Sequence, residues 1–394
     1  MKSNPAVLTF KEIVAGLTVK ILLGLLYGYI YLNYYQGDDT WKHHQASISE
    51  TTLLRKNPKQ FFINEYTPVH ALSEGTTTRE VVTLYLNDLQ YAIFIKSFAI
   101  VNLVTGGNYY LNMSLFNVLV FFGHWWLFAC FVKRFPEKRR WFFLASFFYL
   151  PAVFWLSGLR IDGLLFFFAT LFVFTMLYGT RFRKWILLPV SFAGAFICRP
   201  EFAVLIVPAC VAYLLADRYR SRALTSRPIK IYTLIYICAF ALFFSSPWWM
   251  GGDGLPGIVA HKQSEFLELS GTRFKLEPLT DQTVSYFRVL PQAFANTFLR
   301  PAPWESEGLL QWAASAEVIL LWLMILYIFA FRRDDAWKTR LADPFVLFIF
   351  FFSISVYLCI GALVPFPGAI TRYKAIALIM LANAILTFSK LKSY

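Results

Sequence analysis

Two adjacent carboxylates are the residues of this chain with the clearest potential for chemistry. Asp38 and Asp39 stand in Tyr35-Gln36-Gly37-Asp38-Asp39-Thr40-Trp41, directly after the first long apolar stretch. Neighbouring like charges repel each other, and carboxylates beside a bilayer lose solvation energy. A helix cap for the segment that begins near Thr40 is the alternative interpretation. The acid pair marks the chain as a candidate enzyme.

Further ionisable residues stand between the later apolar stretches. Acids and cations from distant segments, gathered on one membrane face, are the pattern expected of a site for an anionic, amphiphilic substrate. The candidates are Arg160 and Asp162, Arg199 and Glu201, His261 and Lys262, and Arg372 and Lys374.

Three of these four pairs also have a structural interpretation. Arg160 and Asp162 could form a local ion pair at a turn. Arg199 and Glu201 could cap two helices, and Arg372 with Lys374 could anchor a helix end to lipid headgroups. His43 and His44, shortly after the acid pair, are interpreted as histidines of a solvated loop, because no metal-ligand spacing surrounds them.

The composition predicts a polytopic membrane protein of all-α class. The chain is 58% hydrophobic and 19% aromatic, with a mean hydropathy of +0.53. Its net charge of +14 comes from basic residues clustered between apolar stretches, where anionic lipids lie, so we expect membrane lipids and no nucleic acid as partners. The ten predicted spans cover 13–34, 113–132, 141–157, 161–178, 185–198, 201–215, 231–247, 316–331, 345–364 and 371–388.

The orientation follows from the short connections between spans. Their Lys and Arg residues fall mainly on one side, which predicts that both termini are cytoplasmic. The two long segments, 35–112 and 248–315, are then extracytoplasmic, and the acid pair lies at the head of the first. The apolar stretch 89–104 of the first long segment is predicted as an interfacial or re-entrant helix. An eleventh span there would move every later connection to the opposite side of the membrane. We expect one membrane domain over 1–394.

The acid pair after the first span, the long first outer loop and the following bundle resemble the glycosyltransferase C superfamily. Its members include the protein mannosyltransferases and the aminoarabinose transferases, which use polyprenyl-phosphate sugars. The resemblance covers the architecture of most of the chain. Its motifs are Gly37-Asp38-Asp39 and, more weakly, Ser157-Gly158-Leu159-Arg160-Ile161-Asp162, which is similar to an acidic position at the outer end of a family span.

The resemblance implies inverting transfer of a sugar from a polyprenyl-phosphate carrier to a hydroxyl of a glycan, lipid or protein acceptor. It also implies a protein of the bacterial cytoplasmic membrane that acts on cell-envelope glycans, with its active site on the extracytoplasmic side. We expect Asp38 as the general base and Asp39 orienting the acceptor or a divalent metal, with the reverse assignment open. Arg160, Arg199, Lys262 and Arg372 are the expected phosphate ligands.

Two other functions are compatible with the pattern. A polymerase or ligase of lipid-linked polysaccharide would rely on basic residues of the later loop, such as His261, Lys262 and Arg273. A transporter or flippase of lipid-linked sugars would show repeats or broken spans in matching halves, with charges near the middle of the membrane.

Overall fold

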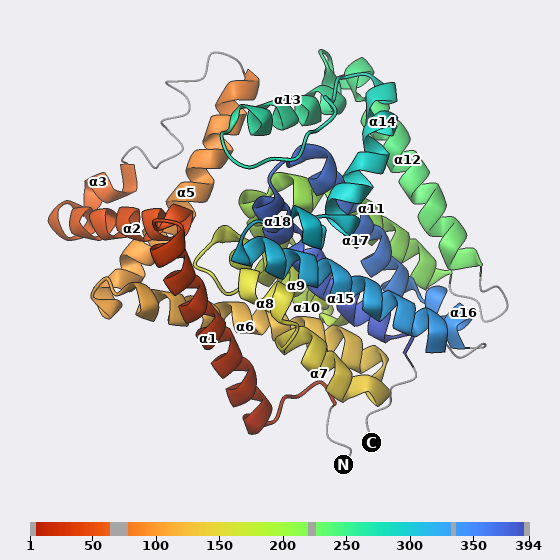
Figure 1. Cartoon of the computed structure of the whole chain (residues 1–394), viewed down its shortest axis with the longest axis horizontal. Helices are drawn as coiled ribbons and strands as arrows, with labels where there is room; N and C mark the ends of the chain where they lie inside the picture. The colour runs from red at the N-terminus through yellow and green to blue at the C-terminus, as the bar shows by residue number, and fades with distance from the viewer. Residues whose placement is uncertain (1–4, 64–77, 220–225, 332–335, 390–394) are drawn as a thin grey trace. The chain divides into compact units, whose positions relative to one another are not determined.

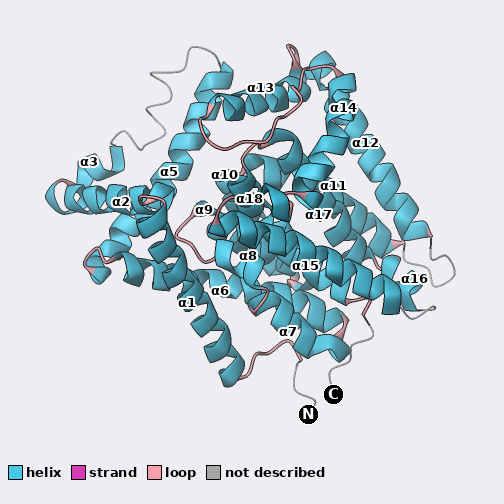
Figure 2. Ribbon diagram, viewed as in Figure 1, coloured by secondary structure: helices cyan, strands magenta, loops and turns pink. Residues whose placement is uncertain are grey.

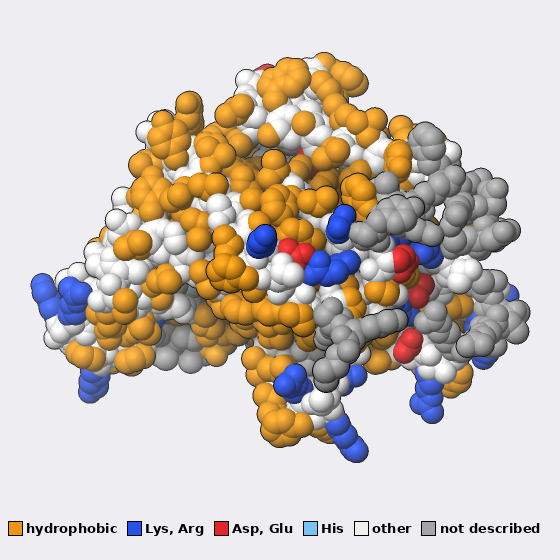
Figure 3. Space-filling model, turned by 90° about the horizontal axis from the view of Figure 1, so that it is seen from below, with side chains coloured by type: hydrophobic (Ala, Val, Ile, Leu, Met, Phe, Trp, Pro, Cys, Tyr) orange, Lys and Arg blue, Asp and Glu red, His pale blue; other side chains and the backbone are white. Residues whose placement is uncertain are grey.

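The computed structural model describes residues 5–63, 78–219, 226–331 and 336–389, and every regular element in them is helical (Figure 2). Eight of these helices are long and apolar enough to cross a membrane. Hydrophobic side chains also cover most of the surface that Figure 3 shows. The chain is therefore an integral membrane protein. The eight helices are α1 (Phe10–Tyr34), α6 (Tyr109–Arg134), α9 (Ile161–Tyr178), α11 (Pro200–Arg218), α12 (Arg227–Met250), α15 (Leu309–Phe331), α17 (Pro344–Leu363) and α18 (Pro367–Leu386).

The other helices are shorter or more polar. They are α2 (Asp38–Lys56), α3 (Pro58–Ile63), α5 (Thr78–Thr105), α7 (Arg139–Phe147), α8 (Leu150–Trp155), α10 (Arg181–Cys198), α13 (Gly254–Glu268), α14 (Thr283–Phe294) and α16 (Ala336–Leu341). Three single turns complete the list: η2 (Pro136–Lys138), η3 (Ala295–Leu299) and η4 (Pro303–Glu305).

Eight of the ten predicted spans coincide with the candidate spans, and two differ. The stretch 141–157 is not continuous, because α7 ends at Phe147 and α8 begins at Leu150. Pro151 lacks the backbone N–H that an incoming helix would need, and its ring restricts the residue before it. The stretch 185–198 is helical, but α10 begins earlier and carries Arg181, Arg183 and Lys184 in its first turn, which lowers its hydropathy.

The two long segments of the sequence contain helices. Segment 35–112 holds α2, α3 and α5, and the apolar stretch 89–104 is the second half of α5, which is not one of the candidate spans. In segment 248–315, α12 continues through Trp249 to Met250 and ends at Gly251 and Gly252, where φ is +75° and +59°. Glycine adopts this left-handed conformation without a steric penalty, so the two glycines end the helix. The interfacial position of these helices remains a prediction.

The helices group into two compact units. The first contains Met1–Cys130 and Val153–Glu201, and the second contains Phe131–Ala152 and Phe202–Tyr394. In the first unit α2 packs along α5, and α9 forms an antiparallel hairpin with α10 (Figure 1). In the second unit α17 and α18 form the central hairpin, with α14 against α17 and α15 against α18.

Glycines on α1 bring α6 close to it in the first unit. A Cβ atom at Gly24 would lie 2.1 Å from the sulfur of Met113, and one at Gly28 would lie 2.5 Å from the ring of Tyr109. Apolar helices in a bilayer associate through close packing of this kind. The Tyr109 hydroxyl then lies 2.9 Å from Thr40 Oγ1, so α6 also fixes the first turn of α2.

Candidate functional site

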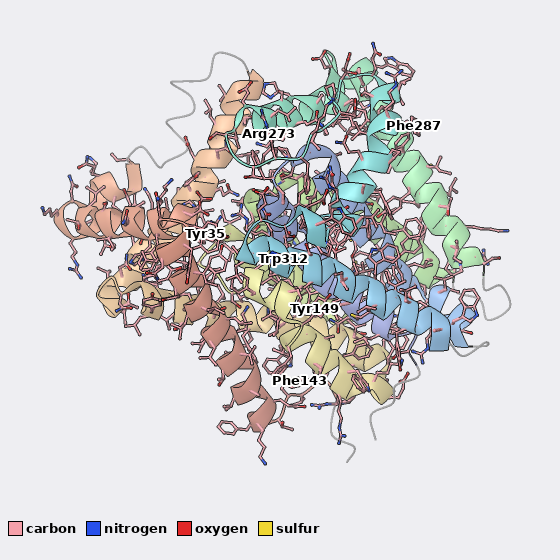
Figure 4. The ribbon with its side chains drawn as sticks, in the orientation of Figure 1. Tyr35, Phe143, Tyr149, Arg273, Phe287 and Trp312 are labelled. Carbon is pink, nitrogen blue, oxygen red and sulfur yellow. The ribbon has the colours of Figure 1, made fainter. Side chains whose placement is uncertain are left out.

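The acid pair begins α2 on an unusual stretch of backbone. Gln36, Gly37 and Asp38 have φ angles of +53°, +93° and +40°, so three consecutive residues lie in the left-handed region. For the two residues that carry a Cβ this conformation costs about 1–3 kcal/mol each, and it persists only where the surrounding structure enforces it. The backbone is held by a hydrogen bond of 2.8 Å from the Gly37 N–H to the Tyr31 carbonyl. Figure 4 labels Tyr35 at this junction.

Arg160 lies behind the acid pair and bonds to both carboxylates. Its Nη1 is 3.0 Å from Asp39 Oδ2, and its Nη2 donates to Asp38 Oδ2. The side chain of Arg160 is 4% exposed, whereas those of Asp38 and Asp39 are 39% and 50% exposed. The guanidinium carbon lies 5.3 Å from the ring centre of Tyr31. A buried cation thus offsets the repulsion between two carboxylates that face outward.

The charges around Arg160 also affect its own ionisation. Burial lowers the pKa of Arg160, but the neighbouring Tyr27, Asp38 and Asp39 outweigh burial and leave the pKa above its ordinary value. Arg160 is therefore a permanent cation of the site.

The segment that carries Arg160 is held by three buried side chains from three helices of the first unit. These are Lys20 on α1, Thr40 on α2 and Asn117 on α6. All three donate hydrogen bonds to segment 156–160. Lys20 Nζ donates to the Leu156 carbonyl at 3.0 Å and to Ser157 Oγ at 3.2 Å. Asn117 Nδ2 donates to the Ser157 carbonyl at 2.8 Å, and Thr40 Oγ1 donates to the Leu159 carbonyl at 3.2 Å. The position of Arg160 is thus set before any ligand binds.

Lys20 is a site residue that sequence reasoning missed. It is fully buried in the apolar helix α1, where an ammonium group is costly unless it is paired or has a function. Its Nζ also lies 3.2 Å from Nε2 of His124. The signal was present in the sequence, because Lys20 is the one basic residue inside the apolar stretch 13–34.

A second ion pair lies at the same end of the α9–α10 hairpin. Arg199 Nη2 is 3.0 Å from Asp162 Oδ1, with side chains that are 19% and 4% exposed. Asp162 lies in the first turn of α9 and Arg199 follows α10, so each charge complements the dipole of its helix. The local pair between Arg160 and Asp162 that the sequence suggested is replaced by two longer-range pairs. Glu201 lies half-buried in the first turn of α11.

His43 lies beside the acid pair, one turn after Asp39 on α2. Its ring packs against Tyr91 and Phe94 of α5, with centroid distances of 5.4 Å and 5.6 Å. Burial lowers the pKa of His43, with Asp39 raising it and Arg160 lowering it. The sequence interpretation of solvated loop histidines was wrong, since His43 is half-buried and His44 is buried on the same helix.

Two predicted site residues of the second unit lie on the surface of α13. His261 Nδ1 and Lys262 Nζ lie 3.2 Å and 2.8 Å from the carboxylate of Glu265, and the side chains are 59% and 44% exposed. Exposed pairs of this spacing on one helix contribute little to stability. The positive charge of Lys262 is thus matched by a carboxylate of the same helix.

The other two predicted site residues of this unit lie on α18. Arg372 Nη2 donates to the Tyr373 hydroxyl at 3.1 Å. Lys374 is buried, with its Nζ 3.0 Å from Glu317 Oε1 of α15 and 3.1 Å from the Thr297 carbonyl. The charge of Lys374 is therefore buried and paired inside the second unit.

The residues of the acid pair do not fit a resident metal ion. Arg160 already bonds to both carboxylates, and its positive charge disfavours a second cation beside them. In the described ranges no group of three His, Cys, Asp or Glu side chains lies close enough together to ligate a metal.

Comparison of the chain with protein-family models, with curated proteins and with solved structures finds no match. The fold is that of a helical integral membrane protein. The reaction that the protein could catalyse depends on the site formed by Asp38, Asp39 and Arg160.

Proposed function

We propose that the protein is a membrane glycosyltransferase that moves a sugar from a polyprenyl-phosphate carrier to an acceptor hydroxyl, with inversion. The observation that carries the proposal is the geometry of Asp38, Asp39 and Arg160. Two half-exposed carboxylates, of which Asp38 stands on strained backbone, lie in front of a buried guanidinium. Preorganised acids of this kind suit a general base that must accept a proton at a defined position.

In the proposed reaction one carboxylate removes the proton of the acceptor hydroxyl. The acceptor oxygen forms a bond to the anomeric carbon, and the bond from that carbon to the carrier phosphate breaks, so the phosphate leaves with the electron pair. We assign Asp39 as the base, because it is the more exposed acid. Asp38, less exposed and also bound by Arg160, orients the acceptor. This assignment reverses the expectation from the sequence.

The departing phosphate needs a cation, and the structure narrows the candidates. Arg160 already bonds to both carboxylates. We therefore assign Arg160 to position the carboxylates and not to bind the phosphate. Arg199 of the first unit is partly exposed and oriented by Asp162, which makes it the favoured phosphate ligand. His261, Lys262 and Arg372 belong to the second unit, so we do not assign them to this site.

The α9–α10 hairpin supports an extracytoplasmic site. Arg160, Asp162 and Arg199 lie at one end of the hairpin, and Arg181 with Lys184 begins α10 at the other. Basic residues of short connections favour the cytoplasmic side, so the site end faces outward, with both termini cytoplasmic. The apolar helices would accommodate the polyprenyl tail, and the membrane would be the bacterial cytoplasmic membrane.

The experiment measures release of polyprenyl phosphate, which is a product whatever the acceptor is. Purified protein in proteoliposomes is given polyprenyl-phosphate hexoses and pentoses, with a cell-envelope extract as the acceptor source. We expect protein-dependent release with one donor, and a decrease of about 10²–10⁴-fold in Asp39→Asn. Exposed Asp217→Asn on α11 serves as the matched control. Full release by Asp38→Asn and Asp39→Asn alike would refute the proposal.

Buried charges among the apolar helices favour one alternative function. The Lys374–Glu317 pair lies inside the second unit, and such pairs occur along transport pathways. The same proteoliposomes distinguish the two functions. Movement of the lipid-linked sugar between leaflets without release of polyprenyl phosphate would indicate a transporter. The ligase alternative would instead require loss of activity in His261→Gln with the acid pair dispensable.

A further inference from the structure

A hollow of about 530 Å³ lies at the turn between α9 and α10 in the first unit. It is lined by Gly179, Arg181, Lys184, Trp185, Leu188 and Pro189. The α9 helix has 18 residues, which at 1.5 Å per residue separates this hollow from Arg160 by about 27 Å. The hollow is therefore independent of the candidate active site.

The lining of the hollow follows from helical periodicity. Arg181, Lys184, Trp185 and Leu188 stand at positions i, i+3, i+4 and i+7 of α10, so they share one face. Arg183 lies two residues after Arg181, about 200° around the helix, and does not line the hollow. The two cations and the indole thus face the same space.

The charge of this face is not balanced within the described residues. Neither Arg181 nor Lys184 has a carboxylate partner there, and the first turn of α10 contains no acid. This contrasts with Arg160, Lys262 and Lys374, each of which is paired with Asp or Glu. A guanidinium and an ammonium without acids nearby complement an external anion.

The other half of the hollow is apolar. The Trp185 side chain is 74% exposed, and Leu188 and Pro189 continue the same face toward the middle of the helix. An exposed Trp next to cations at the end of an apolar hairpin is typical of the membrane–water interface. A ligand for this hollow must therefore carry its negative charge next to a long apolar portion.

We propose that this hollow binds an anionic phospholipid, with its phosphate between Arg181 and Lys184 and an acyl chain along Trp185, Leu188 and Pro189. The charge complementarity selects an anionic headgroup over a zwitterionic one, and the apolar half selects a lipid over free phosphate.

The test is native mass spectrometry of the full chain in detergent. The protein is titrated with phosphatidylglycerol, with phosphatidylcholine of the same acyl chains and with inorganic phosphate. We expect preferential retention of phosphatidylglycerol and no displacement by inorganic phosphate. The double variant Arg181→Gln/Lys184→Gln should bind about 30-fold more weakly, since each basic residue contributes about 1 kcal/mol and 1.4 kcal/mol is tenfold.

Arg183→Gln is the matched control, because it removes the same charge from the same turn without touching the hollow. We expect it to change binding by less than about threefold, because its contribution is only long-range. Equal losses in Arg181→Gln and Arg183→Gln would indicate a general basic surface and overturn the proposal. Equal retention of the two phospholipids by the unaltered protein would overturn it as well, and needs no variant.

Discussion

The guanidinium of Arg160 and the carboxylate of Asp39 meet at 3.0 Å although 121 residues separate them in the sequence. The cation is buried and the carboxylate is half-exposed, so the base that we propose faces outward while its charge is offset from inside. We expect Arg160→Met to remove catalytic activity and to lower stability by about 1–2 kcal/mol, a moderate loss because the acids reach solvent.

A double-mutant cycle separates this contact from general effects. Arg160→Met, Asp39→Asn and the combined variant are compared by unfolding in micelles. We expect a coupling energy of about 0.5–1 kcal/mol, because the two groups are in contact and one is half-exposed. Strictly additive effects would mean that the contact contributes nothing.

Gly37 should not tolerate a side chain. Its φ is +93°, and a Cβ there would lie 3.1 Å from the Cβ of Trp41. We expect Gly37→Ala to lower stability by about 1–2 kcal/mol and to displace the acid pair, which would also reduce activity. Gly308→Ala is the control, since a Cβ at Gly308 meets nothing within 4 Å. Equal melting temperatures of the two variants would contradict the prediction.

Lys20 should matter although it lies far from solvent. Lys20→Met removes the donor to the Leu156 carbonyl and to Ser157, and a buried acceptor without a donor costs about 1–3 kcal/mol. Thermal unfolding measures this loss. Lys11→Met, on the exposed start of the same helix, should have little effect. A Lys20→Met variant that is more stable than the unaltered protein would contradict this prediction. It would show that desolvation of the Lys20 ammonium destabilises the fold by more than its hydrogen bonds stabilise it.

Stability should fall at mildly acidic pH because of His43. Burial lowers its pKa, so the unfolded chain binds more protons than the folded chain as the pH drops below about 6.5. The stabilising contribution is present above this pH and is lost below it. Asp38, Asp39, Lys42 and Arg160 are the charged groups that act on this ring.

Melting temperatures between pH 8 and pH 5 test the effect. In His43→Gln the melting temperature should decrease less between pH 8 and pH 5 than in the unaltered protein. His44→Gln should act in the same direction, since burial lowers the pKa of His44 too. His261→Gln is the control, because that side chain is 59% exposed. A profile that His43→Gln leaves unchanged would exclude His43 as the titrating group.

Replacing one member of the Lys374–Glu317 pair should lower the stability of the protein more than replacing both. Both side chains are 2% exposed, so Lys374→Met would leave a buried carboxylate without its partner, at a cost of about 3–5 kcal/mol. Lys374→Met/Glu317→Gln removes both charges and should recover most of the loss. The unfolding free energies of the three proteins check this order, and a double variant as unstable as the single one would contradict it.

Hydropathy was sufficient to predict the class and most of the helices. Eight of the predicted spans match apolar helices, because the need to satisfy every backbone group within a bilayer makes helix formation a property of each segment. The prediction was wrong for 141–157, where the helix ends at Phe147 and a new one begins at Leu150, directly before Pro151. The span count of ten and the orientation of the termini stay predictions.

The acid pair, the basic clusters and the apolar spans were determined by the sequence alone, because they depend on residue types and local spacing. The partners of the charges were decided only by the tertiary structure. Adjacency suggested that Arg160 pairs with Asp162, but Arg160 lies on extended backbone before α9 and Asp162 lies in its first turn. Helix packing therefore directs Arg160 to Asp38 and Asp39, and Asp162 to Arg199, since an ion pair depends on distance in space.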